Sequence, residues 1–338
     1  MDFGLVSFGT ALGTPAPITD VVGGYTDDPA RVLAYGYRHV LRAPAGVGLT
    51  DLALEAADKA LAQAGLDASD LDLIVLAVTD ITEYLYWDAA ASLAYRLGAT
   101  AAETVLMTQG CAGGPASLDI IAGKFATHPH YDRALVIAAN RCCEAYWNRM
   151  TTQPIAFSDG AVAAVARRGH PRLRWRVTET RTQGRYADFY RLDVGGAADP
   201  FGQRPGQDAP RARDAWSVLD FFDYSDTLFE EFITELNSKT RDVLERACQR
   251  IGIQVSELSR VVLVGDNADN IKSMAECIGV PLPLTNFELA MEYGHLGAAD
   301  QLFSLANSVT HGDLRNGEIL ALVSRGRGMH WSCSLLEA

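Results

Sequence analysis

The chain of 338 residues has no apolar stretch that is both long enough and free enough of charge to span a membrane. Its N-terminus carries Asp2 where a secretory signal would carry basic residues, so we expect a first strand there rather than a signal peptide. The composition, 48% hydrophobic and 21% charged, is typical of a globular protein with about two domain-sized units. A membrane partner is therefore not expected.

Cysteine is scarce, and its spacing is unlike that of a metal site or a disulfide framework. There are six cysteines, at positions 111, 142, 143, 248, 277 and 333, and none of them forms a C-x-x-C pair. Structural zinc sites and secreted disulfide scaffolds both depend on more regular spacing. We therefore expect no metal and no disulfides, and we predict a cytoplasmic location in which thiols stay reduced.

Positive charge is also in short supply. The 29 Lys and Arg residues face 42 Asp and Glu residues, which gives a net charge of −13. This balance argues against nucleic-acid binding, and it would repel an acidic protein partner unless a local basic patch exists. One candidate patch, Arg204, Arg211 and Arg213, lies in a segment rich in Gly and Pro, 181–216, that is typical of a surface excursion. These arginines are either solvated or contact the phosphates of coenzyme A or an acidic carrier protein.

What the sequence does contain is an alternation of apolar runs and amphipathic helices. Leu73–Val78 and Ala134–Ala139 are uninterrupted apolar runs, typical of strands that are covered on both faces. Leu52–Leu61 has helical spacing and is followed by Gly65, a C-cap candidate, and a second helix is predicted from about Asp226 to Ile251. This alternation predicts an α/β layered fold.

The second half of the chain repeats the first. Gly65–Leu71, followed by Ile74–Leu76, has a counterpart in Gly252–Leu258, followed by Val261–Leu263. The spacing within the two copies is the same, and each copy follows an amphipathic helix. A repeat of this length indicates two copies of one α/β unit.

We therefore predict an N-terminal half, residues 1–170, and a C-terminal half, residues 171–338, the second containing the excursion. The register of the repeat places Tyr293–Gly297 opposite the turn at Cys111. Pseudo-twofold packing of the halves would bring both turns to one central site.

Cys111 lies in the stretch Met107–Pro115, which is framed by glycines and follows an apolar run. Pro115 is tolerated in the first turn of a helix, so the stretch predicts a strand, a tight turn, the cysteine and then a helix. A thiol at a helix N-terminus is favoured as thiolate. The functional interpretation is a covalent nucleophile, and the alternative is a buried core cysteine.

Several motifs together resemble the thiolase superfamily, and most closely β-ketoacyl-acyl carrier protein synthase III. Besides the helix and strand at 50–78 and the cysteine turn at 109–114, the motifs are Ser158–Ala161, Val264–Ala268, Tyr293–Ala299 and Gly326–Trp331. The resemblance covers nearly the whole chain. It implies a thiolase fold, in which duplicated α/β halves form an αβαβα layered sandwich, and a homodimer.

The departures from the synthase are informative. The resemblance leads us to expect a histidine within Val264–Ala268, where this chain has Asp266, and an asparagine directly after Gly294, where it has His295. Asp300 follows five residues later. A Cys–His–Asp set resembles the synthase-III-like acyltransferases of polyketide and antibiotic pathways. That branch implies acyl transfer to a hydroxyl or a carrier thiol without carbon–carbon bond formation.

The chemistry of these residues favours the same branch. Decarboxylative condensation creates an enolate whose oxygen needs neutral donors, and an ionised Asp266 would repel it. Asp300 can orient His295 and stabilise its charged form, which makes the histidine a general base for Cys111 and for the acceptor. The alternatives are a structural histidine and a helix-capping aspartate. The backbone N–H of Cys111 is one candidate oxyanion donor, and the resemblance implies that of Arg327 as the second.

We therefore predict an acyltransferase with catalytic Cys111, His295 and Asp300. It would take an acyl group from acyl-coenzyme A or acyl carrier protein and pass it to a hydroxyl, for example on a sugar of a glycosylated polyketide, or to a carrier thiol. No cofactor beyond the coenzyme A thioester is expected. Two alternatives stay open: a condensing synthase that primes a polyketide, and a non-catalytic binding partner with the same fold.

Overall fold

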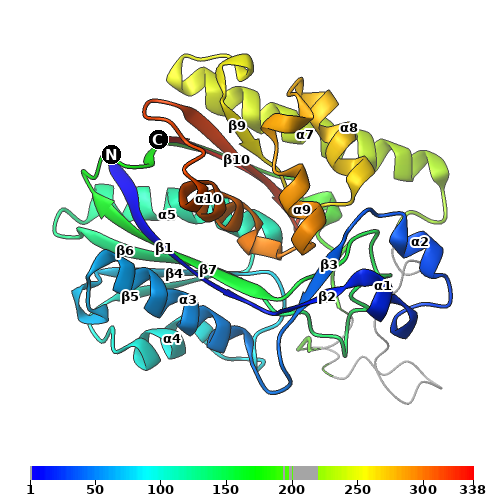
Figure 1. The fold of residues 1–338 in the computed structure, drawn as a ribbon, viewed down its shortest axis with the longest axis horizontal. Coiled ribbons are helices and arrows are strands. Elements are labelled where there is room, and N and C mark those ends of the chain that lie inside the picture. Colours follow the sequence, from blue (N-terminus) through cyan, green and yellow to red (C-terminus); the bar gives the residue numbers. More distant parts are fainter. Residues whose placement is uncertain (1, 193–194, 198–199, 201–219) are drawn as a thin grey trace.

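The computed structural model describes residues 2–192, 195–197, 200 and 220–338. Two groups of strands form the framework (Figure 1). The first group contains β1 (Phe3–Leu12), β4 (Leu73–Val78), β5 (Glu103–Met107), β6 (Arg133–Asn140) and β7 (Gly160–Arg168). The second contains β8 (Arg174–Thr182), β9 (Arg260–Val262), β10 (Ile319–Gly326) and β11 (His330–Glu337).

The strand order is β5-β4-β6-β7-β1 in the first group and β8-β11-β10-β9 in the second. A single residue pair, Gly4 with Arg174, joins the two groups edge to edge. In the first group β4 is parallel to its neighbours β5 and β6, and in the second β9 is parallel to β10. The chain passes from one group to the other between Arg168 and Arg174, and we propose that the two halves divide at residue 170.

Helices form three layers around the strands (Figure 1). The outer face of the first group is covered by α3 (Leu49–Ala64) and α4 (Ala89–Leu97), and that of the second group by α7 (Asp226–Ile251) and α8 (Ala268–Ile278). Between the groups lie α5 (Gly113–Thr127) and α10 (Asp300–His311). These five layers confirm the predicted αβαβα sandwich.

Short elements complete the fold. They are the hairpin β2 (Thr14–Pro17) and β3 (His39–Arg42), the helices α1 (Ile18–Val21), α2 (Pro29–Leu33) and α9 (Phe287–Tyr293), and the 3₁₀ turns η1 (Val22–Gly24), η2 (Ala68–Asp70), η3 (Gly110–Ala112), η4 (Gly184–Tyr186), η5 (Val255–Glu257), η6 (Leu282–Leu284) and η7 (Gly297–Ala299).

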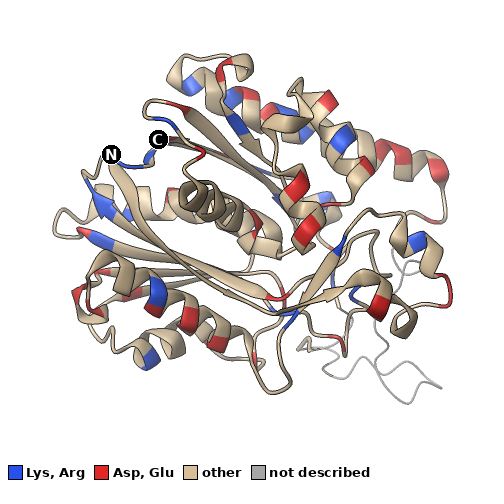
Figure 2. Cartoon of the chain, in the orientation of Figure 1, with Lys and Arg blue, Asp and Glu red and all other residues tan. Residues whose placement is uncertain are grey.

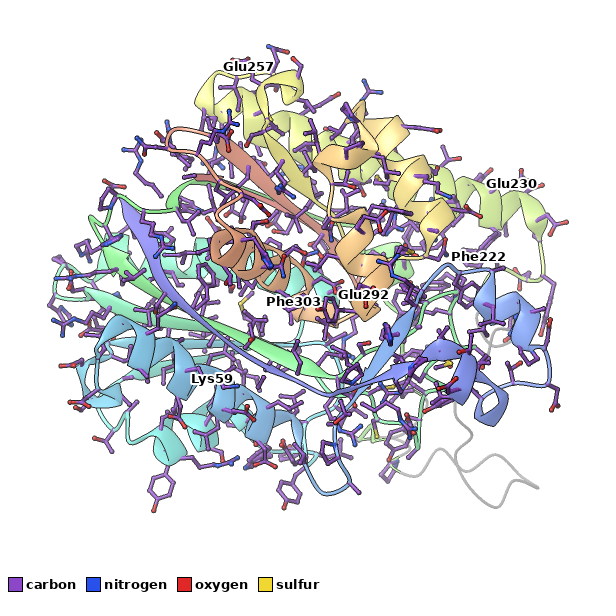
Figure 3. All side chains as sticks on the ribbon, in the orientation of Figure 1. Lys59, Phe222, Glu230, Glu257, Glu292 and Phe303 are labelled. Atoms are coloured by element: carbon purple, nitrogen blue, oxygen red, sulfur yellow. The ribbon has the colours of Figure 1, made fainter. Side chains whose placement is uncertain are left out.

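The sequence pattern explains the layering. Ile74 and Leu76 of β4 pack in the outer core with α3 and α4, whereas Leu73 and Val75 pack in the middle core with α5. A strand buried on both faces needs an uninterrupted apolar run, as β4 has. Figure 3 shows how side chains fill the layers, with Phe303 of α10 between the two groups of strands.

The two copies of the repeat have the same local structure. Helix α3 ends at the left-handed Gly65 and is followed by η2, in which the side chain of Asp70 accepts from the Asp67 N–H. Helix α7 ends at the left-handed Gly252 and is followed by η5, in which Glu257 makes the equivalent bond. The duplication predicted from the sequence is therefore present in the fold.

The segment expected to be a surface excursion differs at its start. Strand β8 continues to Thr182, and Tyr186 and Phe189 are buried, because the chain turns inward and packs aromatic rings against α7. Arg204, Arg211 and Arg213 lie outside the described residues.

Acidic side chains gather at the N-terminal end of α7, where Asp226, Glu230 and Glu231 lie (Figure 2). Arg38, directly before β3, forms ion pairs with Glu288 and Glu292. Within the described part of the chain, no helix is long and apolar enough to cross a membrane.

Candidate active site

The nucleophile candidate Cys111 lies at the carboxyl edge of the parallel strands. Strand β5 ends at Met107, the chain makes the turn η3, and α5 begins at Gly113, so that Pro115 falls in its first turn. The Ser324 hydroxyl holds this turn by donating to the Cys111 carbonyl oxygen at 2.6 Å. The predicted order of strand, turn, cysteine and helix is confirmed, and the thiol faces a cavity rather than the core.

His295 is in direct contact with this thiol. Its Nε2 lies 3.1 Å from Cys111 Sγ, across 184 residues of sequence. Its backbone is fixed by two bonds, from its N–H to Ala156 O at 2.9 Å and from Ser158 N–H to its carbonyl at 2.8 Å. Gly294 precedes it with φ of 71°, and a Cβ there would lie 2.6 Å from Ser158 Oγ. Only glycine fits at this position, because the backbone is left-handed and the space is filled.

Asp300 completes the chain of contacts. Its Oδ2 lies 2.6 Å from His295 Nδ1 and also accepts from the Gly265 N–H at 2.8 Å. Its Oδ1 accepts from the Leu296 N–H at 2.7 Å. With a carboxylate on Nδ1, the neutral imidazole carries its proton there and turns the Nε2 lone pair toward the thiol.

The electrostatics of His295 follow from this arrangement. Burial lowers the pKa of the imidazole. The charges of Asp300 and Cys111 and their hydrogen bonds raise it by more than burial lowers it, so the pKa lies well above its usual value. The imidazolium form is therefore stabilised beside the sulfur.

The two candidate oxyanion donors lie close together. A Cβ on Gly326 would come within 2.9 Å of the Cys111 backbone nitrogen, and a Cβ on Gly110 would come within 3.1 Å of the Arg327 nitrogen. The loop after β10 thus packs backbone to backbone on the cysteine turn. Both backbone nitrogens therefore lie where these two segments meet.

Hydrogen bonds of Ser158 and Asp159 fix the backbone that holds His295. Asp159 is fully buried and accepts from the Arg149 guanidinium at 3.1 and 3.2 Å and from the backbone N–H of Ala43 and Cys142. Ser158 Oγ accepts from the Leu41 N–H and donates to the Tyr293 carbonyl. These buried bonds lock the segment that holds His295 in place.

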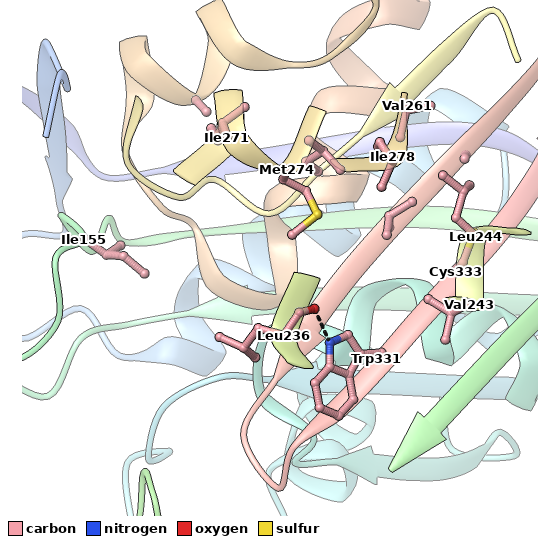
Figure 4. Close-up of a cluster of buried hydrophobic side chains, with 14 of the residues drawn as sticks. Ile155, Leu236, Val243, Leu244, Val261, Ile271, Met274, Ile278, Trp331 and Cys333 are labelled. Carbon is pink, nitrogen blue, oxygen red and sulfur yellow. Dashed lines mark hydrogen bonds between the residues drawn. The ribbon is translucent and has the colours of Figure 1, made fainter. Parts of the chain in front are cut away.

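Cys111 and His295 open onto a cavity of about 420 Å³. Its apolar wall includes Phe157, Phe189, Phe232 and Leu236. A hydrogen bond from Trp331 Nε1 to the Leu236 carbonyl, 3.1 Å long, anchors α7 over β11 and so fixes this wall (Figure 4).

Some residues of the cavity were not predicted from the sequence. Asp80 and Asn140 follow the apolar runs of β4 and β6, and polar residues at the carboxyl ends of parallel strands are a recognisable signal. Tyr190 and Arg325 gave no such signal. Asp266 lines the cavity and forms an ion pair with Arg325 at 2.7 Å.

The C-terminal part of the chain matches a known protein family, and most of the chain is similar to curated proteins. Residues 248–338 match the family model described as 3-oxoacyl-[acyl-carrier-protein] synthase III C terminal. The chain is 26% identical over 290 residues to the β-ketoacyl-[acyl-carrier-protein] synthase III of Synechocystis sp., a match that covers 86% of this chain and 83% of that protein.

Two solved structures show the same fold. ChlB3, described as an acyltransferase, has a TM-score of 0.86 at 23% identity, covering 100% of this chain and 98% of that chain. The priming β-ketosynthase of the R1128 polyketide pathway has a TM-score of 0.80 at 19% identity, covering 99% and 96%. The chain therefore has the thiolase fold, and in sequence it is similar to β-ketoacyl-[acyl-carrier-protein] synthase III.

Proposed function

We propose that the protein is an acyltransferase that carries the acyl group as a thioester of Cys111. The observation that supports this most is the continuous contact from Cys111 Sγ through His295 to Asp300, at 3.1 and 2.6 Å. The donor would be acyl-coenzyme A or an acyl carrier protein. The acceptor would be a hydroxyl, for example on a sugar of a glycosylated polyketide, or a carrier thiol, in a pathway of secondary metabolism such as antibiotic biosynthesis.

In the first half-reaction, His295 Nε2 takes the proton of Cys111, and the thiolate attacks the thioester carbonyl. The N–H groups of Cys111 and Arg327 would hold the oxyanion. The carbonyl then re-forms, the bond to the donor sulfur breaks, and the donor thiol leaves with the proton from His295. An acyl-cysteine remains.

In the second half-reaction, the acceptor gives its proton to His295 and attacks the acyl-cysteine. The bond to Cys111 breaks, and the sulfur recovers the proton from the imidazolium. Asp300 stabilises that imidazolium in both halves. Each proton transfer of this kind is worth about 10²–10⁴-fold in rate.

A condensing synthase that primes a polyketide is the second candidate, supported by the names of the curated relatives and of the R1128 enzyme. Against it stands the Asp266 carboxylate, which is bonded to Arg325, to Asn270 and to the Asn267 N–H where the resemblance leads us to expect a histidine. A carboxylate at that position would repel an enolate. A purely binding role has less support. It would not explain why the base His295 contacts the thiol of Cys111 inside a cavity.

We also propose a homodimer and a cytoplasmic location. Strand β5 is at the edge of its sheet, and in the loop between β4 and α4 Tyr84, Leu85 and Tyr86 are 67%, 62% and 112% exposed. A second copy could cover such an edge and its aromatic neighbours. The six free cysteines suit a reducing compartment. The mass in solution, measured by light scattering, tests the dimer; a monomeric mass would contradict it.

Covalent loading tests the proposed function. We expect intact-mass spectrometry to show an acyl adduct on the wild type and none on Cys111→Ala. Cys277→Ala is the matched control, because this half-buried free thiol on α8 lies outside the cavity and should leave the adduct in place. An adduct that survives Cys111→Ala would refute the assignment of the nucleophile.

A further inference from the structure

An ion pair lines the cavity onto which the reacting thiol opens. Arg325 Nη2 and Asp266 Oδ2 are 2.7 Å apart. Arg325 directly precedes Gly326, the residue whose backbone packs on the Cys111 nitrogen. Asp266 directly follows Gly265, whose N–H donates to the catalytic candidate Asp300. In sequence the pair thus adjoins both the oxyanion loop and the residue whose N–H binds Asp300.

The two members of the pair differ in how fully they are bonded. Asp266 uses both oxygens, because Oδ1 also accepts from the Asn267 N–H at 2.8 Å and from Asn270 Nδ2 at 2.9 Å. Arg325 has five N–H donors. Within the described residues only two of its nitrogens donate, Nη2 to Asp266 and Nη1 to Asn237 at 3.5 Å. The guanidinium therefore keeps donors for a ligand.

Tyr190 adds a second donor to the same part of the cavity. Its ring packs on Phe189 at 4.3 Å between centroids, and among the described residues its hydroxyl has no hydrogen-bond partner. Burial raises the pKa of Tyr190, so the phenol stays protonated in the cavity that Arg325, Cys111 and Asp266 also line. Its O–H can donate to the same ligand atom as Arg325.

The surroundings make these donors selective. Phe157, Phe189, Phe229 and Phe232 line the same cavity, so a chain that lies there is mostly in apolar contact. In such a pocket a small number of polar groups fixes which ligand is accepted. The Tyr190 hydroxyl and the remaining N–H groups of Arg325 would bind an acceptor oxygen on the acyl group.

Charge decides which kind of oxygen is bound. Asp266 already neutralises Arg325 at 2.7 Å. An acyl group with its own carboxylate would place two anions on one guanidinium in a poorly solvated site, which is unfavourable. A hydroxyl or ketone oxygen accepts the same hydrogen bonds without that repulsion.

We propose that Tyr190 and Arg325 form an acyl subsite for a neutral oxygen, a hydroxyl or ketone close to the thioester, and that Asp266 excludes acyl groups bearing a free carboxylate. The proposal rests on the proposed function, since it names the acyl class that Cys111 accepts. Three residues that lie apart in the sequence then set donor specificity beside one thiol.

Four coenzyme A thioesters of equal chain length test the subsite: butyryl, 3-hydroxybutyryl, acetoacetyl and succinyl. The measurement is the rate of Cys111 loading, followed by intact mass. We expect the hydroxy and keto groups to load about tenfold faster than butyryl, the effect of one or two hydrogen bonds, and succinyl to load slowest.

Two variants separate the roles. Tyr190→Phe should reduce the preference for hydroxybutyryl over butyryl by about fivefold. Tyr186→Phe is the matched control, because this nearby phenol is bonded to Glu235 outside the cavity and should leave the preference unchanged. Asp266→Asn keeps the shape, removes the charge and should raise succinyl loading about tenfold relative to butyryl.

The outcomes are distinguishable. If all four thioesters load Cys111 equally, or if Tyr190→Phe changes only transfer to the acceptor, the subsite proposal is wrong and the proposed function stands. If succinyl loads fastest on the wild type, the charge argument is wrong. If none of the four loads, both proposals are overturned.

Discussion

Replacing Asp300 with asparagine tests the division of work between His295 and its carboxylate. Three N–H donors converge on this side chain, from His295 Nδ1, Gly265 and Leu296, at 2.6, 2.8 and 2.7 Å. An amide offers one oxygen and one NH₂ group where the carboxylate offers two oxygens. In either orientation at least one of these donors faces the NH₂ group, and the charge that stabilises the imidazolium is lost.

The size of the effect follows from those contacts. One unsatisfied buried donor costs about 1–3 kcal/mol of folding stability. Loss of the anion lets burial dominate, so the pKa of His295 falls from its raised value. A weaker and mis-oriented base should slow transfer to a hydroxyl by about 10²–10⁴-fold. Loading should fall less, because the helix terminus also favours the thiolate.

Single-turnover kinetics measure both steps, with acyl-enzyme formation followed by mass and acyl release followed after addition of the acceptor. Asp72→Asn is the matched control, since this carboxylate accepts two backbone N–H groups, at 2.8 and 2.9 Å, next to β4 and outside the cavity. It should keep its release rate. If Asp300→Asn released the acyl group as fast as the wild type, Asp300 would be a structural cap and the triad assignment would be wrong.

Other predictions follow from the same geometry. The folded-state pKa of His295 is raised, so the stability that its protonation contributes is complete below about pH 6.5 and is lost as pH rises through the raised pKa. The difference in Tm between the wild type and Asp300→Asn should therefore be larger at low pH than at high pH. An equal difference at both would contradict this. Acyl-enzyme offered malonyl-carrier protein should release no carbon dioxide, because Asp266 is a paired carboxylate; steady release would favour the condensing alternative. Gly326→Ala should abolish loading, because its Cβ would lie 2.2 Å from the Gln109 carbonyl, whereas Gly184→Ala meets nothing within 4 Å and should load normally. Ser158→Ala should cost about 1–3 kcal/mol in denaturant unfolding, because it leaves the buried Leu41 N–H without its acceptor; an unchanged midpoint would contradict that reasoning.

Much of the fold could be predicted because its signals are local. Leu73–Val78 is buried throughout, as an uninterrupted apolar run requires, and the helix predicted from Asp226 to Ile251 has those bounds. Gly65 and Gly252 end equivalent helices, and the sequence around them repeats, so the duplication can be predicted from the sequence alone. Cys111 stood out through its glycines and the helix that follows it.

The rest depends on contacts between distant residues. Arg325 pairs with Asp266 across 59 residues, and no sequence pattern around either residue predicts this pairing. Tyr190 belongs to a stretch that resembles a surface loop in composition. That stretch turns inward because its neighbour Phe189 packs on aromatic residues of α7 such as Phe232. The register of the repeat placed the stretch containing His295 opposite the turn of Cys111, 184 residues away, but the roles of His295 and Asp300 came from the family resemblance.

The central claim is that one acyl group passes unchanged through Cys111. Its most direct test is a chase of isolated acyl-enzyme with the acceptor, followed by mass spectrometry of both the protein and the product. The account predicts that the adduct leaves the peptide containing Cys111 and that the product carries the same acyl mass. A product extended by two carbons, or an adduct that maps to another residue, would contradict it.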